Sequence, residues 1–467
     1  MIKFIKQNPT VFYLALLTFA LSLCTALQLS NLSSIYRLLG ASTSYLPALW
    51  LGPPLTGLII QPLIGQISDD TITRYGKRLP YIVGWSVLAA LTSIALPFLS
   101  TLFAAVIFTL LMNCSLNGGI EALRALTGDV VNKETECSKA FALQAFFAGI
   151  GGALGAGLPY LIYKWSIYSN IKILSIAHTI PLNLKISFIL SGIILLSITV
   201  LTVLKVQEKP NKHTTLLSKR VKKINLSQRI VKITSDFYFS IKKMPPRFKS
   251  ICIIHSVSWA GIFIFWLYFT TALAQNFYGL PLHTVVNMNS KHSALFQSAT
   301  LDSSFYFSIY QYVSIIYSGI LYFFSKNHTK NIYTHAVSLL IGSIAIILFP
   351  FEKTPFTIEC AMVAYGIMWG SIMVLPYAIA IRYIPRRNLG IYLGIFNICI
   401  TAPQIICGLS LAFIYYYILK ENASYLLSFG GFILMVSAGL WIKFIRAQSH
   451  KEFSPDKILG LKSISAS

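Results

Sequence analysis

Residues 102–129 read LFAAVIFTLLMNCSLNGGIEALRALTGD, an apolar run that becomes polar toward its end. About 20 mostly apolar residues suffice to cross a bilayer as a helix. Asn113, Asn117, Glu121 and Arg124 follow one another at intervals of four, four and three residues, so they share one helix face. A charge at the bilayer centre costs about 2.5–3.5 kcal/mol on insertion scales, so such a face usually turns toward the inside of a helix bundle. The stretch therefore predicts a membrane helix with a polar inner face.

The whole chain has the composition of a membrane protein. Of its 467 residues, 55% are hydrophobic and 11% are charged, whereas soluble domains carry about 25% charged residues. Twelve apolar runs start near Val11, Tyr45, Tyr81, Leu102, Phe141, Leu182, Ile251, Phe305, Ile332, Phe356, Leu389 and Tyr425. The predicted fold class is an all-α membrane protein with twelve transmembrane helices in two six-helix bundles.

A polar stretch between the sixth and seventh runs sets the predicted division of the chain. We expect an N-terminal six-helix bundle over residues 1–204 and a basic cytoplasmic linker over 205–250. The prediction continues with a C-terminal six-helix bundle over residues 251–446 and a cytoplasmic tail over 447–467. Six helices on each side of a long linker is a layout used by transporters whose halves are structural repeats.

Lysine and arginine set the predicted orientation. The formal charge is +24, from 38 basic and 14 acidic residues. Thirteen basic residues lie between Lys205 and Lys249, and only seven fall on the opposite side of the predicted membrane. Cytoplasmic loops are enriched in Lys and Arg, so both termini are predicted to be cytoplasmic. The KRVKK run at 219–223 is either a contact for anionic lipids of the bilayer or a solvated linker.

Several classes of function are disfavoured by the sequence. The basic residues lie between apolar runs rather than on one polar domain, which argues against nucleic-acid binding. No paired carboxylates, metal cluster or nucleophile with a base is visible, so neither an enzyme nor a cofactor is expected. The seven cysteines lack CxxC or Cys/His spacing, so they are interpreted as packing residues rather than disulfides or metal ligands.

Polar residues also mark the first and eleventh predicted helices. Gln28 and Asn31 lie near the end of the first, and their amides can donate and accept hydrogen bonds to sugar hydroxyls or hold helices together. The eleventh has a small and polar face that comprises Gly390, Gly394, Asn397, Thr401, Gln404 and Gly408. Its glycines are interpreted as packing residues, while Asn397 and Gln404 are candidates to line a cavity.

The seventh predicted helix has an aromatic face. His255, Trp259, Phe263 and Trp266 share it. Aromatic rings stack on the C–H faces of sugars, and at helical spacing they are equally typical of a protein core. His255 either carries a coupling proton, because its pKa lies near neutrality, or is a neutral histidine with a hydrogen-bond partner.

Two charged segments are candidate gates. The loop GQISDDTITRYGKR at 65–78 puts Asp69, Arg74, Lys77 and Arg78 at a cytoplasmic helix end. An acid beside several bases can form a latch that closes in one conformation and opens in another. A second latch is predicted at residues 382–387, with Arg382 and Arg386 as its gating residues.

Five segments together resemble the sugar/cation symporter branch of the major facilitator superfamily. This branch contains plant sucrose transporters, the animal melanosomal transporter group and bacterial sucrose or maltose permeases. The segments are ALQLSNLSSIYRLLGA from Ala26, LTGLIIQPLIGQISDDTITRYGKRLPY from Leu55, NGGIEALRALTGD from Asn117, SWAGIFIFWLYFTTALAQNFYG from Ser258 and GSIMVLPYAIAIRYIPRRNLGIYLGIFNICITAPQ from Gly370. They fall in both halves, so the resemblance covers nearly the whole chain. The bacterial branch is the most similar, which implies the inner membrane of a bacterial cell as the location.

The resemblance implies uptake of an α-glucoside by rocking of two six-helix bundles, coupled to protons. Arg124 matches the arginine that the family ties to substrate and coupling, and Glu121 fits an acid that precedes it in bacterial members. Asn113 stands where the family usually has a proton-binding Asp, and Asn cannot ionise. Coupling is then either absent or moved to Glu121 or His255.

The sequence thus predicts a transporter for a disaccharide such as sucrose or maltose, with a proton as its coupling cation. The candidate substrate residues are Gln28, Asn31, Asn113, Asn117, Arg124, Trp259, Asn397 and Gln404. The candidate proton-coupling residues are Glu121, Arg124 and His255. An uncoupled facilitator, an exporter of another solute and a sugar sensor without transport stay open as alternatives.

Overall fold

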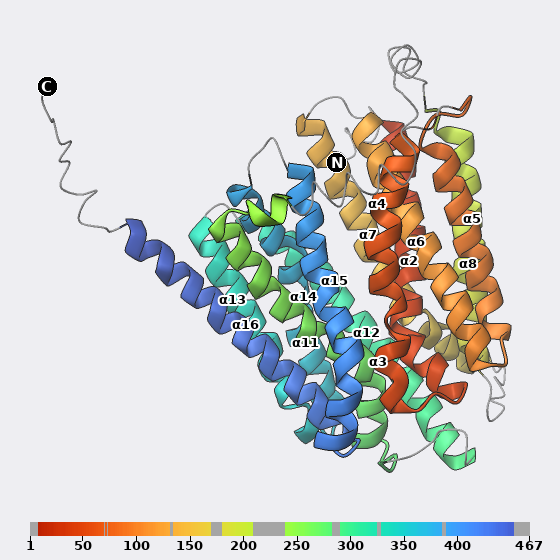
Figure 1. Ribbon diagram of the computed structural model, residues 1–467. Helices are drawn as coiled ribbons and strands as arrows, with labels where there is room; N and C mark the ends of the chain where they lie inside the picture. The colour runs from red at the N-terminus through yellow and green to blue at the C-terminus, as the bar shows by residue number, and fades with distance from the viewer. Residues whose placement is uncertain are drawn as a thin grey trace, which may run out of the picture.

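The computed structural model describes residues 8–69, 71, 73–130, 134–169, 180–208, 239–282, 290–324, 328–384 and 389–452, and these are almost entirely helical (Figure 1). Each of the twelve apolar runs lies in a helix, so the predicted fold class is confirmed. The first group comprises α2 (Pro9–Leu38), α3 (Leu46–Leu49), α4 (Gly52–Asp69), α5 (Leu79–Ala95), α6 (Leu102–Val130), α7 (Glu134–Tyr168) and α8 (Leu182–Lys205). The short α3 continues into α4 and forms one span with it.

The second group begins after the linker, most of which lies outside the described residues, including the KRVKK run. It comprises α11 (Pro246–Asn276), α12 (Ser290–Phe324), α13 (His328–Ile347), α14 (Pro355–Ala380), α15 (Leu389–Phe413) and α16 (Ala423–Glu452). Within the described chain, eleven spans are long and apolar enough to cross a membrane, one for each predicted helix except α12.

Helix α12 is the main departure from the expected boundaries. It spans 35 residues and starts at Ser290, well before the predicted start near Phe305. Its first half carries Ser293, Thr300, Ser303 and Ser304, all buried against other helices. Hydropathy misses this half because buried hydroxyls that bond to their own helix or to a neighbour are tolerated inside a bundle.

Several close contacts between helices, within the first half and between the two halves, depend on small residues. A side chain at Gly151 or Gly155 of α7 would collide with the backbone carbonyls of Phe19 or Leu23 in α2. Gly408 of α15 likewise packs on Leu51, just before α4, which agrees with its interpretation as a packing residue. Without a hydrophobic driving force between helices in lipid, such close approach is a main source of association.

The two halves meet in a crossed arrangement, in which α12 packs on α7 and α15 packs on α3 and α4. We call the end that holds α3 and the α15–α16 connection the closed end. The opposite end, where α4 meets α5 and α8 leads into the linker, is the linker side. Figure 1 shows the two groups of helices converging toward the closed end and leaning apart toward the linker side.

A polar relay fastens the halves near the closed end. The indole of Trp50 donates to the hydroxyl of Ser33 at 2.9 Å, and that hydroxyl donates to the carbonyl of Leu267 in α11 at 2.8 Å. The Trp50 ring also contacts Phe263 edge-on, with centroids 5.9 Å apart. These contacts must break before this end can open.

Glu352 is a buried acid in the connection between α13 and α14 at the closed end. The amide of Asn276 donates to the carbonyls of Phe349 and Glu352, at 2.9 Å each, and holds this connection in place. The Glu352 side chain is only 9% exposed, and its Oε2 atom has no hydrogen-bond partner within the described chain. Burial therefore raises the pKa of this carboxyl from 4.5 to about 8.

Glu352 should make stability depend on pH. Below about pH 4.5 the carboxyl is neutral in both the folded and the unfolded chain, so it imposes no cost. As the pH rises toward about 8 the unfolded chain loses this proton first, and the folded state loses stability. The thermal midpoint of the native chain should therefore fall more steeply over this range than that of Glu352→Gln. Parallel curves for the two proteins would contradict the account.

Candidate functional site

Both asparagines on the polar face of α6 are already bonded. The Asn117 amide accepts a hydrogen bond from Gln61 at 2.8 Å and donates to the Thr56 hydroxyl at 3.1 Å, both on α4. Asn113 donates to the carbonyl of Thr109 on its own helix at 2.9 Å. Asn117 therefore ties α6 to α4 in this conformation.

Glu121 and Arg124 lie three residues apart on α6 but differ in their surroundings. Among the residues that the structure describes, the two side chains form no ion pair with one another. Glu121 is half-buried, with Oε1 near Gly65 of α4, whereas Arg124 is exposed. Arg124 also interacts electrostatically with Tyr377 of α14, in the other half of the molecule. The charge of Arg124 therefore acts on the second half.

On that second half, Tyr377 leads to a predicted substrate residue. Its hydroxyl donates to Oδ1 of Asn397 in α15 at 3.1 Å, and its ring packs against Phe396. Arg124, Tyr377 and Asn397 thus form a polar group that spans both halves, on the linker side of the closed-end contacts. Gln404, two turns further along α15, is buried and donates to the carbonyl of Ile400 at 3.2 Å.

Gln28 differs from the asparagines. Its side chain is fully buried in α2, and neither its Oε1 nor its Nε2 has a hydrogen-bond partner within the described chain. Leaving a buried donor or acceptor unbonded costs about 1–3 kcal/mol for each group. A buried amide with both ends unbonded calls for a specific explanation.

Asn31 has all of its polar atoms engaged. Its Nδ2 donates to the carbonyl of Leu27, and its Oδ1 accepts from the hydroxyl of Ser304 in α12 at 3.1 Å. It therefore joins the two halves, which is the role of helix contact that the sequence left open. It also lines a cavity of about 390 Å³ beside Asn183 of α8 and Thr300 of α12.

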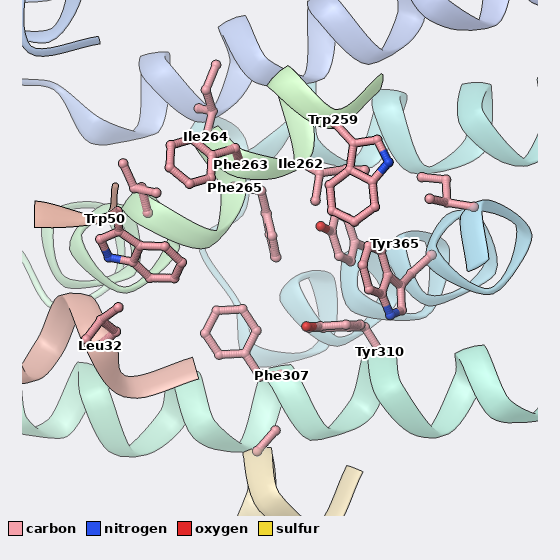
Figure 2. Close-up of a cluster of buried hydrophobic side chains, with 14 of the residues drawn as sticks. Leu32, Trp50, Trp259, Ile262, Phe263, Ile264, Phe265, Phe307, Tyr310 and Tyr365 are labelled. Atoms are coloured by element: carbon pink, nitrogen blue, oxygen red, sulfur yellow. The ribbon is translucent and has the colours of Figure 1, made fainter. Parts of the chain in front are cut away.

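The aromatic face of α11 is part of a large buried cluster (Figure 2). Trp259 contacts Trp266 and Trp369 edge-on, at centroid distances of 6.0 and 5.8 Å. Figure 2 shows Trp259 in the same buried cluster as Tyr310 of α12 and Tyr365 of α14. Trp259 is 6% exposed, so in this conformation it serves as a core residue.

His255 is held by that cluster. Its Nε2 accepts a hydrogen bond from the indole of Trp259 at 2.8 Å, and its ring stacks on Phe396 at 4.7 Å. An indole N–H can only donate, so this Nε2 carries no proton here. Protonation of His255 at Nε2 requires the Trp259 bond to break, and the geometry matches the neutral alternative.

The loop after α4 is anchored within the first half. Nε of Arg78 bonds to Asp129 of α6 at 3.2 Å, and Lys77 pairs with the same carboxylate at 3.0 Å. Arg78 also donates to the carbonyl of Gly65 at 3.0 Å. The Glu208 carboxylate accepts from the backbone N–H groups of Arg78 and Leu79, at 2.9 and 3.0 Å. These contacts fix α4, α5, α6 and the end of α8 to one another.

The structure shows less about the remaining candidate gating residues. Arg74 is exposed and lies over the ring of Tyr75, at 4.6 Å from its centroid, and Arg382 is exposed at the end of α14. The backbone of Asp69 ends α4, but its side chain lies outside what the structure describes. Arg386 lies outside the described residues altogether.

A family model described as Major Facilitator Superfamily matches residues 14–408. This chain belongs to the major facilitator superfamily. It is therefore a multi-pass membrane transporter and not an enzyme.

The curated relatives of this superfamily member include plant sugar carriers. It is 22% identical over 414 residues to the sucrose transport protein SUC4 of Arabidopsis thaliana, covering 82% of this chain and 79% of the relative. It is 24% identical over 434 residues to the sucrose transport protein SUT2 of Oryza sativa subsp. indica, covering 82% of each.

Solved structures of the superfamily share the fold at low sequence identity. The nucleoside transporter NupG superposes with a TM-score of 0.61 at 14% identity, covering 95% of this chain and 99% of that one. An inward-facing, unoccupied bacterial homolog of the human lysosomal transporter Spinster gives 0.66 at 12% identity, covering 96% and 98%.

The sequence alone did not single out two acids that hold the loop between α4 and α5 in place. Asp129 ends the quoted fourth-helix segment, and Glu208 stands just after Lys205 at the start of the linker. The available signal was the rarity of acids, since the chain has only 14. Their partners are 51 and 130 residues away in sequence, and spacing rules cannot connect them.

Asp129 should stabilise the linker side more than Lys77 does. Asp129→Asn removes a carboxylate that bonds to Arg78, whose side chain is 6% exposed, and we expect a loss of about 1–3 kcal/mol. Lys77→Gln removes a side chain that is 32% exposed and should cost about 0–1 kcal/mol. Thermal unfolding of the purified variants gives the comparison, and equal losses would contradict this ranking.

Proposed function

We propose that this transporter carries a disaccharide such as sucrose or maltose across a cell membrane by alternating access. The named function of the plant relatives supports a sugar substrate. The observation that carries the proposal is the Gln28 amide, which is buried one turn before Asn31 and has no side-chain hydrogen bond within the described residues. Sugar hydroxyls donate and accept, so they satisfy both ends of such an amide.

The other proposed substrate contacts differ in how readily they become available. Arg124 is exposed, and its charge acts on Tyr377 of the second half. Tyr377 in turn donates a hydrogen bond to Asn397. Trp259 and Gln404 are nearly buried and become available only if their helices move. Asn31 and Asn117 hold helices together in the present state, whereas Asn113 is bonded within α6. Exchanging these bonds for sugar hydroxyls is the proposed way in which substrate alters the helix contacts.

The proposed orientation puts the linker side in the cytoplasm of a bacterial cell. The excess of Lys and Arg in the linker and in the α4–α5 loop supports this assignment. In this orientation, both termini are cytoplasmic, the closed end faces outward, and the present state accepts or releases sugar on the inside. In the opposite state the linker side closes, with Asp69, Arg74, Lys77, Arg78, Arg382 and Arg386 as the proposed gating residues.

Proton coupling is proposed to act through Glu121 and Arg124. The two lie one turn apart on α6, close enough to interact electrostatically but not bonded to each other. A proton on Glu121 changes the charge beside Arg124 and hence the contact of the arginine with sugar or with Tyr377. His255 is the alternative carrier of the coupling proton. Its protonation at Nε2 would break the hydrogen bond that Trp259 donates to it.

Replacing Gln28 separates a substrate role from a structural one. Gln28→Met keeps the side chain's length and removes two unbonded polar groups, so stability should be unchanged or higher. Uptake of labelled disaccharide into proteoliposomes should fall at least about tenfold, since one lost substrate hydrogen bond of about 1.4 kcal/mol already has that effect.

Asn31→Leu is the matched comparison. It breaks the bond from Ser304, and it should lower the thermal stability by about 1–3 kcal/mol. Full sugar uptake by Gln28→Met, measured with sucrose, maltose and other labelled disaccharides, would overturn the assignment of Gln28.

The coupling residue can be tested by restoring and removing ionisable groups. Asn113→Asp adds the carboxyl that related sequences usually carry, and it should make uptake more dependent on an imposed pH gradient. Glu121→Gln should abolish accumulation driven by the gradient and leave sugar exchange at equal concentrations intact. Native uptake that ignores both pH and sodium gradients would mean an uncoupled facilitator.

A further inference from the structure

A cavity of about 610 Å³ lies at the closed end, between the two halves. One wall comes from the end of α2 and the turn that follows, with Arg37, Ser42 and Ser44. The opposite wall comes from the end of α15 and the connection to α16, with Phe413 and Glu421. The cavity is distinct from the polar group around Arg124 and contains none of the predicted substrate residues.

The two walls carry opposite charges. Arg37 is only 2% exposed, and it interacts electrostatically with Glu421 across the cavity. Its guanidinium also lies over the ring of Phe296 in α12, at 5.3 Å from the centroid. A positive and a negative wall favour a ligand that carries both charges over a simple anion or cation.

The backbone of the second wall has an unusual shape. The last turn of α15 widens into a π-helix at Ile414–Ile418, and the next turn puts Lys420 and Glu421 at positive φ, 47° and 60°. Such conformations cost of order 1–3 kcal/mol each in a non-glycine residue and tend to occur at functional sites.

Hydrogen bonds hold this turn in place. The backbone N–H of Glu421 donates to the carbonyl of Tyr415 at 2.9 Å. The carbonyl of Glu421 accepts from the Tyr415 hydroxyl at 2.8 Å and from Gln275 of α11 at 3.0 Å. The strained turn is therefore fixed in the wall of the cavity and carries the Glu421 carboxylate with it.

The rim of the cavity is apolar and exposed. Leu409 and Phe413 are 72% and 60% exposed, and Ile406, one turn earlier, is 65% exposed. Spacings of three and four residues put all three on one face of α15, which in a membrane protein is covered by lipid chains. Tyr416 and Tyr417 also line the cavity and pack edge-on against each other at 4.9 Å.

We propose that this cavity binds the headgroup of a zwitterionic phospholipid from the leaflet at the closed end. The phosphate lies toward Arg37 and the hydroxyls of Ser42 and Ser44, as phosphates prefer cationic and hydroxyl donors. The ammonium lies toward the Glu421 carboxylate and the ring of Tyr416, which attract cations. The acyl chains follow the apolar face of α15.

This lipid is proposed to act on the transport cycle. Its two charged partners, Arg37 and Glu421, belong to different halves, so the complete site exists only while the closed end is closed. A ligand that binds one state better than another shifts the population toward that state. The lipid therefore stabilises the state described here and opposes opening of this end.

Native mass spectrometry of the full chain in detergent tests the proposal. The chain is titrated with phosphatidylethanolamine, which is zwitterionic, and with phosphatidylglycerol, which is anionic. We expect the native chain to bind the first about tenfold more tightly, because only that lipid carries an ammonium group that the Glu421 carboxylate attracts. Glu421→Gln should abolish this preference, whereas Glu359→Gln, which changes an acid outside the cavity, should preserve it.

A second pair of variants tests the proposed contact with the lipid phosphate. Ser44→Ala should weaken binding of both lipids by about threefold to tenfold, whereas Ser410→Ala, on the same rim but outside the cavity, should weaken neither. Equal affinity of the native chain for the two lipids, or a preference that survives in Glu421→Gln, would overturn the proposal. Displacement of the lipid by a soluble disaccharide would also overturn it and make the cavity a sugar site.

Discussion

The closed-end contact between the halves is the constraint on which the rest of the structure depends. Trp50, Ser33 and the carbonyl of Leu267 form a continuous relay from the first half to α11, and Asn31 adds a bond from Ser304 of α12. These bonds lie among buried side chains, where an unbonded polar group costs about 1–3 kcal/mol. The contact is therefore specific, and opening this end requires new partners for each group.

The buried polar residues fall into two classes. Asn31 and Asn117 hold helices together, and their bonds are complete. In the part of the chain that the structure describes, the Gln28 amide has no hydrogen-bond partner, and Glu121 and Arg124 are not paired with each other. A residue of the first class fixes one conformation. A residue of the second class is left ready for a ligand, which is the basis on which the proposed sugar and proton sites rest.

Much of the fold was predictable because it follows from hydropathy. Each apolar run became a helix, and the break after Lys205 separates two groups of six. The first half of α12 was missed because its buried hydroxyls look like a loop when their partners are unknown. Thr300, Ser303 and Ser304 bond to carbonyls of α12 itself, and Ser304 also donates to Asn31 of α2. These partners become visible only in three dimensions.

The site was less predictable for the same reason. The shared face of Asn113, Asn117 and Glu121 follows from helical spacing, but the bonds from Asn117 to α4 do not. Arg37 was passed over because it looks like an ordinary basic residue at a helix end, and burial gives it another role. The roles of Asp129 and Glu208 depend on the loop between α4 and α5, which the fold places beside them.

The central claim is that the two ends of the molecule open in alternation, and paired distance measurements test it most directly. Spin labels on Ala48 and Ser410 report on the closed end, and labels on Tyr75 and Ile381 report on the linker side; all four side chains are exposed. Adding a transported disaccharide with a pH gradient should lengthen the first distance and shorten the second. Distances that stay fixed, or that change in the same direction, would contradict the account.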